Sequence, residues 1–251
     1  MLRARGITKR FAGIVALDGI DLDVEAGERV GLIGPNGAGK TTCFNCLLGV
    51  LAVDAGTVEL DGRDLSGLPA DRRAALGIGR TFQRIELFPG NSVRDHLFVA
   101  ERVRRGTGRL WRDVLGLGGP TRDELRRCDE VLDLLGLRAL ADEPIERLSL
   151  GQCRLVEVGR ALMTEPKLLL LDEPSSGLDR DETAALATTL RDVQAQQGFA
   201  ILLVEHDVDL VVDFTTRAYV LDFGRLLAAG ATRDVLDSPE VRAAYLGEPV
   251  P

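Results

Sequence analysis

A segment near the N-terminus combines glycines, one lysine and two hydroxyl side chains in an order suited to binding phosphate. Its residues are, in sequence, Gly34, Pro35, Asn36, Gly37, Ala38, Gly39, Lys40, Thr41 and Thr42. Glycines allow backbone amides to converge on phosphate oxygens, and the N-terminus of a following helix adds its positive end. In this pattern Lys40 reaches the β and γ phosphates, and the Thr41 hydroxyl can hold Mg²⁺. The segment therefore predicts a site for a nucleoside triphosphate.

The residues around this segment supply the strand and the helix that the pattern requires. A compact apolar run ends at Ile33, and apolar residues then recur at helical spacing, at Phe44, Leu47 and Leu48. The alternative is a glycine-rich turn with an incidental lysine, which this context disfavours. We therefore expect a strand, a phosphate-binding loop and a helix, in that order.

A pair of acids ends a second apolar run. Four leucines at residues 168–171 precede Asp172 and Glu173. Adjacent acids at the end of a buried strand are costly unless a cation or a water molecule needs them, so a solvated strand end is the weaker alternative. Loops that bind the phosphates of ATP work with a further carboxylate that holds the metal. We assign Asp172 to the metal and Glu173 to the water that attacks the γ-phosphate.

A second helix N-terminus lies shortly before these acids. Ser149, the Gly151 amide and Gln152 precede a helix whose apolar periodicity runs to Leu162. Hydroxyl and amide donors at the start of a helix can bind phosphate. Taken alone, the segment is better explained as an ordinary capped helix. Its position just ahead of the two acids favours a role in the phosphate site instead.

The apolar periodicity also predicts the strands of the first third of the chain. Alternating apolar residues from Ile20 to Val24 end at a turn at 26–28, and the apolar run 29–33 follows. This pattern predicts a hairpin followed by a buried strand. Alternation that ends in Asp61-Gly62 predicts a further short antiparallel pair.

Helices are expected throughout residues 92–165. Asn91 or Ser92 can cap the first helix, and Thr121 with Glu124 forms a capping box for the next. The insertion is therefore mostly helical.

The last third of the chain alternates strands with helices. The apolar runs 168–171 and 200–204 have the composition of buried parallel strands, and Asp179 can cap the helix between them. A hairpin is expected at 219–227, and a last helix begins at Ser238. The alternation predicts a parallel sheet with crossover helices.

Length, charge and cysteine content exclude several classes of protein. The chain has 251 residues and a net charge of -8. It contains no apolar run of about 18 residues, so it is not by itself a channel. The acidic balance argues against nucleic acid as a partner, and the absence of a signal-peptide core indicates a cytoplasmic protein. Cys43 and Cys46 form a C-x-x-C pair, but no second pair of ligands completes a zinc set.

The order of these motifs resembles that of the ATP-binding-cassette (ABC) ATPases over nearly the whole chain. Residues 34–42 match the family's Walker A motif, 148–152 its signature motif and 168–173 its Walker B motif. By the same resemblance Asp179 belongs to the D-loop, His206 is the switch histidine, and Gln83 is the Q-loop glutamine that senses Mg²⁺ and water. Phe11 stands where the family places an aromatic residue that stacks on adenine. Taken singly, Phe11, Gln83 and His206 also fit a surface aromatic, a strand-end polar residue and a helix cap.

The resemblance implies a fold. That fold is an α/β P-loop NTPase (RecA-like) with a parallel-sheet core, an N-terminal antiparallel β subdomain and an inserted α-helical subdomain. It makes a single nucleotide-binding domain of residues 1–251. The core and the β subdomain occupy 1–91 and 166–251, and the helical signature subdomain occupies 92–165.

The resemblance also implies cofactors and partners. In the family, ATP with Mg²⁺ lies between the Walker A motif of one subunit and the signature motif of a second, here Ser149, Gly151 and Gln152. The pair of ATPase subunits serves transmembrane permeases at the inner face of the cell membrane.

Softer features resemble the ATPases of branched-chain amino-acid importers, which also work with a solute-binding protein. They are Arg80-Thr81-Phe82-Gln83, the segment 87–89, an arginine-rich stretch from Arg102 to Arg112, and the C-terminal residues 245–248. Leu150, Ser175, Ser176 and Asp179 depart from that subgroup's usual residues. The rival functions are the ATPase of a lipid or lipopolysaccharide exporter and a soluble cassette ATPase without a transport role.

Overall fold

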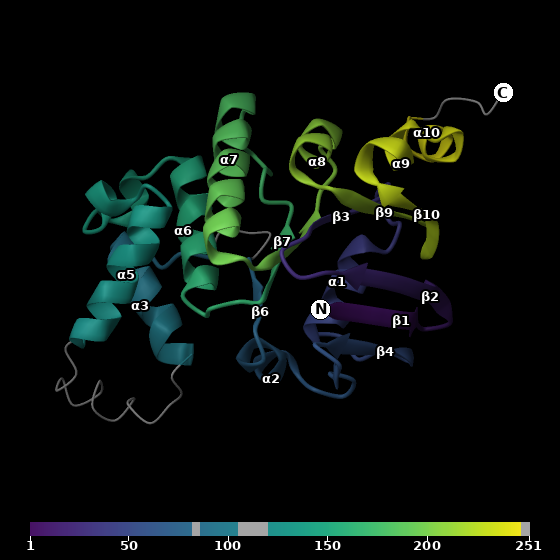
Figure 1. The fold of residues 1–251 in the computed structure, drawn as a ribbon, viewed down its shortest axis with the longest axis horizontal. Coiled ribbons are helices and arrows are strands. Elements are labelled where there is room, and N and C mark those ends of the chain that lie inside the picture. Colours follow the sequence, from purple (N-terminus) through teal and green to yellow (C-terminus); the bar gives the residue numbers. More distant parts are fainter. Residues whose placement is uncertain (82–85, 105–119, 247–251) are drawn as a thin grey trace.

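Two β-sheets and a group of helices make up the part of the chain that the structure, a computed structural model, describes (Figure 1). This part comprises residues 1–81, 86–104 and 120–246. Gln83 and most of the arginine-rich stretch, including Arg105, Arg109 and Arg112, lie outside the described residues, as does the C-terminal segment 247–251.

The larger sheet has six strands and carries the candidate chemistry. In sequence order they are β3 (Arg29–Ile33), β6 (Ile78–Arg80), β7 (Leu168–Asp172), β8 (Ala200–Val204), β9 (Arg217–Asp222) and β10 (Arg225–Ala231). Their order across the sheet is β10-β9-β3-β8-β7-β6. All neighbouring pairs are parallel except β10 with β9. The parallel sheet and the C-terminal hairpin predicted from the apolar runs are confirmed.

The smaller sheet is antiparallel and comes mostly from the N-terminus. It contains β1 (Leu2–Phe11), β2 (Ile14–Val24), β4 (Ala55–Leu60) and β5 (Arg63–Asp64), in the order β2-β1-β4-β5. The hairpin expected near β2 is formed with β1, which precedes it. The turn at residues 26–28 instead sends the chain into the larger sheet, where β3 is buried. The alternation of β1 is short, because its register shifts between Ala4 and Ile7, so the sequence did not show the partner of β2.

Helices fill the middle of the chain and cover the larger sheet. The middle segment contains α3 (Val93–Arg104), α5 (Arg122–Leu134), the short turns η2 (Arg138–Leu140) and η3 (Ile145–Arg147), and α6 (Leu150–Leu162). The others are α1 (Lys40–Leu48), α2 (Ala70–Ala75), α7 (Arg180–Gln197), α8 (Val208–Phe214), α9 (Thr232–Asp237) and α10 (Pro239–Leu246). The capping boxes predicted at Thr121 and Asp179 are present. None of the helices in the described segments is both long and apolar enough to cross a membrane.

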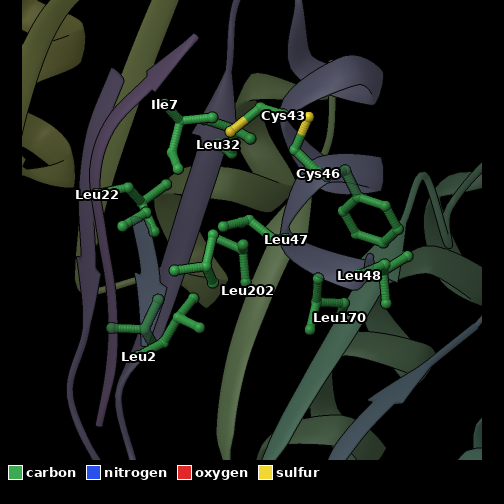
Figure 2. Close-up of a cluster of buried hydrophobic side chains, with 14 of the residues drawn as sticks. Leu2, Ile7, Leu22, Leu32, Cys43, Cys46, Leu47, Leu48, Leu170 and Leu202 are labelled. Atoms are coloured by element: carbon green, nitrogen blue, oxygen red, sulfur yellow. The ribbon is translucent and has the colours of Figure 1, made fainter. Parts of the chain in front are cut away.

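One core cluster joins α1 to both sheets (Figure 2). Leu2 and Ile7 approach from the smaller sheet, and Leu32 and Leu202 from the larger one, while Leu47 comes from α1. Each of these side chains is fully buried. The helix that follows the glycine-rich loop is therefore held from two sides.

Cys43 and Cys46 belong to this core rather than to a surface site (Figure 2). Burial raises the pKa of the Cys43 thiol to about 12. Because the thiolate is the form that binds metals and attacks disulfides, Cys43 acts here as a small apolar side chain.

A buried arginine holds the C-terminal end of α1. Arg73, on α2, donates from Nη1 to the carbonyls of Cys46 (2.9 Å) and Leu47 (2.8 Å), and from Nε to that of Leu68 (3.0 Å). The last carbonyls of a helix lack partners within the helix, and cations near them are stabilising. Arg73 therefore fixes the end of α1 opposite the glycine-rich loop.

Replacing Arg73 with methionine should destabilise the fold, because the apolar stem is kept while the carbonyls of Cys46, Leu47 and Leu68 lose their bonds to the guanidinium. We expect the Arg73→Met variant to lose about 3 kcal/mol of the free energy of unfolding, measured by urea denaturation. The neighbouring Arg72 side chain is 74% exposed. Its Arg72→Met variant is the control and should change stability by less than about 0.5 kcal/mol. Equal losses in the two variants would contradict the capping role of Arg73.

Candidate nucleotide-binding site

The loop between β3 and α1 is built so that only glycine fits at two of its positions. A Cβ atom on Gly34 would lie 2.2 Å from the Leu221 carbonyl oxygen, and one on Gly39 would lie 2.8 Å from that of Ala16. Gly39 caps α1 with a φ of 101°, and no side chain bonds to this helix end. Because the first amides of a helix have no partners within it, the amides at the start of α1 are available to an anion.

The Lys40 ammonium lies inside this loop. Its Nζ donates to the carbonyls of Gly34 (2.6 Å) and Pro35 (3.1 Å), and the residue is buried. Burial lowers the pKa of Lys40, while the nearby carboxylates of Glu173 and Asp172 oppose that shift. The lysine therefore faces both acids that end β7.

Asp172 lies in an environment that disfavours its charge. Burial, followed by the charge of Glu173, raises the pKa of Asp172 to about 6, although Arg80 and Lys40 act in the opposite direction. Glu173 has a φ of 46°, in the left-handed region. Such a backbone conformation costs on the order of 1–3 kcal/mol in a residue with a side chain. A bound cation would relieve the carboxylates, so this donor set fits Mg²⁺.

Strand β8 ends beside these acids and leads to His206. Asp172 pairs with Val204 in the sheet, and the Glu173 amide donates to the Val204 carbonyl at 2.8 Å. The His206 side chain is 60% exposed. Because β3, β8 and β7 are adjacent and parallel, the glycine-rich loop, His206 and the two acids meet at one edge of the sheet.

A hollow of about 490 Å³ opens at this edge. It is lined by the loop and the start of α1, by Glu173, by Ile14, Val15 and Ala16, and by Phe223 and Gly224. Phe223 was not found from the sequence, where it is an ordinary residue of a hairpin turn. It is 86% exposed and has a φ of 42°. Phe11 does not line this hollow, and the Lys9 ammonium lies 5.6 Å from the centre of its ring.

The second predicted phosphate-binding segment lies elsewhere in the chain. Ser149 Oγ accepts from the Gln152 amide (3.3 Å), and the Gln152 side chain accepts from the Ser149 amide (2.9 Å). This reciprocal pair is a capping box at the start of α6, which lies beyond β7 from α1 (Figure 1). Ser149, Gly151 and Gln152 do not line the hollow at the glycine-rich loop. The two phosphate-binding segments of one chain are therefore separate.

The start of α6 contacts the loop that follows β7. The buried Arg154 side chain pairs with Glu157 (3.2 Å) and donates to the Ser176 carbonyl (3.2 Å). Glu157 also accepts from the Glu86 amide at 3.2 Å. Asp179 in the same loop caps α7, because its side chain accepts from the Glu182 amide at 2.8 Å. Arg154 and Glu157 were missed in the sequence, where their spacing marks only one helix face.

Comparison with known proteins agrees with this geometry. The sequence profile of the ABC transporter family matches residues 17–176. The chain belongs to this family. A relative of this ABC protein is LivG of Salmonella typhimurium, a high-affinity branched-chain amino acid transport ATP-binding protein. LivG is 38% identical, and the match covers 99% of this chain and 98% of LivG.

Solved structures of ABC cassettes have the same fold. The ADP conformation of MJ1267, an ATP-binding cassette of an ABC transporter, matches with a TM-score of 0.88 and 32% identity over 99% of each chain. A dimeric post-hydrolysis state of the cassette MJ0796, bound to ADP and Pi, matches with a TM-score of 0.75 and 25% identity. That match covers 93% of this chain and 99% of MJ0796. The P-loop NTPase fold is confirmed, and this ABC chain is a nucleotide-binding ATPase subunit.

The charge of Asp172 should make the metal-free ABC subunit less stable. Because the pKa of Asp172 is higher in the folded than in the unfolded chain, folding is penalised once the carboxylate ionises. The penalty is absent below about pH 4, grows toward pH 6 and is complete above it. In EDTA at pH 8, the free energy of unfolding of Asp172→Asn should therefore exceed that of wild type by about 1–2 kcal/mol, allowing for partial solvent screening.

Urea denaturation across the pH range checks this expectation. The advantage of Asp172→Asn should shrink toward pH 5, as the wild-type carboxyl takes up its proton. Asp192→Asn, at an exposed position of α7, is the control and should show no such dependence. A variant that is less stable than wild type at pH 8 would contradict the electrostatic description of the site.

Proposed function

We propose that this chain is the ATP-hydrolysing subunit of an importer for branched-chain amino acids or similar small polar solutes. The meeting of Lys40, Asp172, Glu173 and His206 at one sheet edge carries the hydrolytic part of the proposal. The near full-length similarity to LivG supports the choice of substrate. The chain would act from the cytoplasm, on the inner face of the cell membrane.

The domain arrangement in this proposal is a single nucleotide-binding domain. Its core and β subdomain comprise residues 1–91 and 166–251, and its helical signature subdomain comprises 92–165. The clustering of α3, α5 and α6 on one side of the larger sheet supports this division (Figure 1).

The residues of the site divide the work of hydrolysis between them. Residues 34–42 bind the phosphates through backbone amides, and Lys40 supplies positive charge. Thr41, Asp172 and Gln83 would hold Mg²⁺, which would supply positive charge beside the phosphate oxygens. Glu173 orients and polarises the attacking water, and His206 lies at the γ-phosphate. Phe11 remains the candidate for stacking on adenine.

A second copy or a homologous chain completes the ATP site. Ser149, Gly151 and Gln152 lie apart from the hollow of their own chain, so they serve the nucleotide of a partner, with Asp179 at the same interface. A two-fold symmetric pair has two such sites. The dimeric MJ0796 structure supports an ATPase pair of this kind.

An apolar groove beside the helical segment is suited to a permease. It has a volume of about 360 Å³ and lies between α1, α2 and β6 on one side and α3 and α6 on the other. Val50 and Val99 line it and are 49% and 38% exposed. Arg80, three residues before Gln83, also lines it. We assign the groove to a cytoplasmic segment of the permease, since movement of α6 on hydrolysis would change its width.

Glu173→Gln should abolish hydrolysis but retain ATP binding, so that two chains remain locked around ATP. Lys40→Ala should instead weaken nucleotide binding itself, because it removes the cation of the loop. Size-exclusion chromatography at micromolar concentration measures both effects. With ATP and Mg²⁺, the Glu173→Gln chain should elute as a dimer and the Lys40→Ala chain as a monomer. A Glu173→Gln chain that stays monomeric and yet binds ATP would rule out the shared site.

Uptake of labelled leucine tests the transport role. Deleting the gene in its own host should abolish high-affinity uptake, and the wild-type gene should restore it. Glu173→Gln should not restore uptake, and Val99→Glu should restore little while its isolated chain still hydrolyses ATP. Unchanged solute uptake combined with a defect in lipid or lipopolysaccharide export would overturn the importer in favour of an exporter.

A further inference from the structure

A fully buried carboxylate lies between the loops that follow β7 and β8. Glu205 is 0% exposed and comes directly after Val204, the last residue of β8. Glutamates are almost never fully buried unless their oxygens are paired, because an unpaired buried charge is very costly. The position of Glu205 therefore requires donors that are fixed around it.

The two oxygens of Glu205 serve two different loops. Oε1 accepts from the Ser175 amide at 3.0 Å and from Ser175 Oγ at 2.6 Å. Oε2 accepts from the His206 amide at 3.0 Å and from that of Asp207 at 3.5 Å. Short bonds to an ionised oxygen are stronger than bonds between neutral groups. One side chain thus joins the loop after β7 to the loop after β8.

The loop on the Ser175 side contains the residue that acts on water. Ser175 lies two residues after Glu173, and the turn between them is closed by a bond from the Ser176 amide to the Glu173 carbonyl (3.1 Å). Ser175 is itself buried. A serine at this position is explained by its hydroxyl, which donates to the buried carboxylate of Glu205.

The loop on the other side holds His206 through its backbone amide, and the His206 ring lies near the same carboxylate. The His206 side chain is 60% exposed, and its Nδ1 lies 3.7 Å from Glu205 Oε2. The bond from the His206 amide fixes the backbone from which this exposed ring projects. Glu205 itself is not among the residues that line the hollow at the glycine-rich loop.

We propose that Glu205 is a positioning residue that sets the distance between Glu173 and His206. This inference rests on the proposed function, because both of those residues are assigned to ATP hydrolysis there. The role of Glu205 is to hold two backbone segments in register, so that the water and the γ-phosphate meet in one geometry.

The side-chain chemistry indicates which substitutions disturb this geometry. Glu205→Gln puts an amide group, which is a donor, against the amide donors of Ser175 or His206, so one loop loses its acceptor. Ser175→Ala removes a single donor and keeps the backbone bond. Glu205→Asp keeps the charge but is one methylene shorter, so it reaches only one loop.

Steady-state ATP hydrolysis by the full chain tests the proposal. Glu205→Gln should lower kcat about tenfold or more with KM for ATP changed less than about twofold, since ground-state binding is untouched. Ser175→Ala should lower kcat about threefold, and the double variant should be no slower than Glu205→Gln alone. Glu205→Asp should recover only part of the lost rate. In the Glu173→Gln background, Glu205→Gln should still give the ATP-locked dimer.

A matched control separates positioning from stability. Thr215→Val removes a buried hydroxyl bond to Thr232 (2.8 Å), away from the glycine-rich loop. It should lower thermal stability and leave kcat unchanged. If Glu205→Gln slows hydrolysis no more than this control, or raises KM with kcat unchanged, the proposal is wrong.

Two further outcomes test the proposal and the function on which it rests. If Glu205→Gln does not fold, Ser175→Ala must still lower kcat without changing KM, and an unchanged kcat overturns the proposal. A wild-type chain that does not hydrolyse ATP, or a Glu173→Gln chain that does not dimerise with it, would refute the proposed function instead.

Discussion

Strand β8 is hydrogen-bonded to β3 on one side and β7 on the other, so its end lies between the glycine-rich loop and the two acids. A shift of one residue in either ladder would turn the side chains at these strand ends to the opposite face of the sheet. The position of the site therefore depends first on the register of these strands and only then on the identity of its side chains. Burial of α1 between both sheets holds the remaining part, because the same core cluster fixes the helix that follows the loop.

The electrostatics of this edge explain how a protein with a net charge of -8 binds a polyanion. The acids Asp172, Glu173 and Glu205 gather at the strand ends, and Lys40 and Arg80 are the cations that act on Asp172. Burial, followed by the charges of Glu173 and Glu205, raises the pKa of Asp172. With a metal and a triphosphate, each charge gains a neighbour of opposite sign. The charges of this edge thus favour the proposed binding of ATP together with a cation.

The sequence predicted the features that leave local marks. Residues only a few positions apart were enough to predict the glycine-rich loop, the helix caps at Thr121 and Asp179 and the parallel strands. Contacts between distant segments leave no such mark: Arg73 bonds to carbonyls 26 and 27 residues away, and Glu205 bonds to Ser175 across 30 residues. Nor did the sequence show that Phe223 borders the hollow and Phe11 does not, because both depend on how two hairpins approach the loop.

The capping box at Ser149 and Gln152 bears on how two chains would meet in the proposed dimer. Each side chain already satisfies an amide of its partner, so the start of α6 is ordered before any nucleotide arrives. Association then costs little conformational entropy at this end, and the serine hydroxyl keeps its own hydrogen for a phosphate oxygen. A preorganised surface also changes little on separation. The same reciprocal pair therefore suits the proposed interface, which would open and close once in every cycle of ATP hydrolysis.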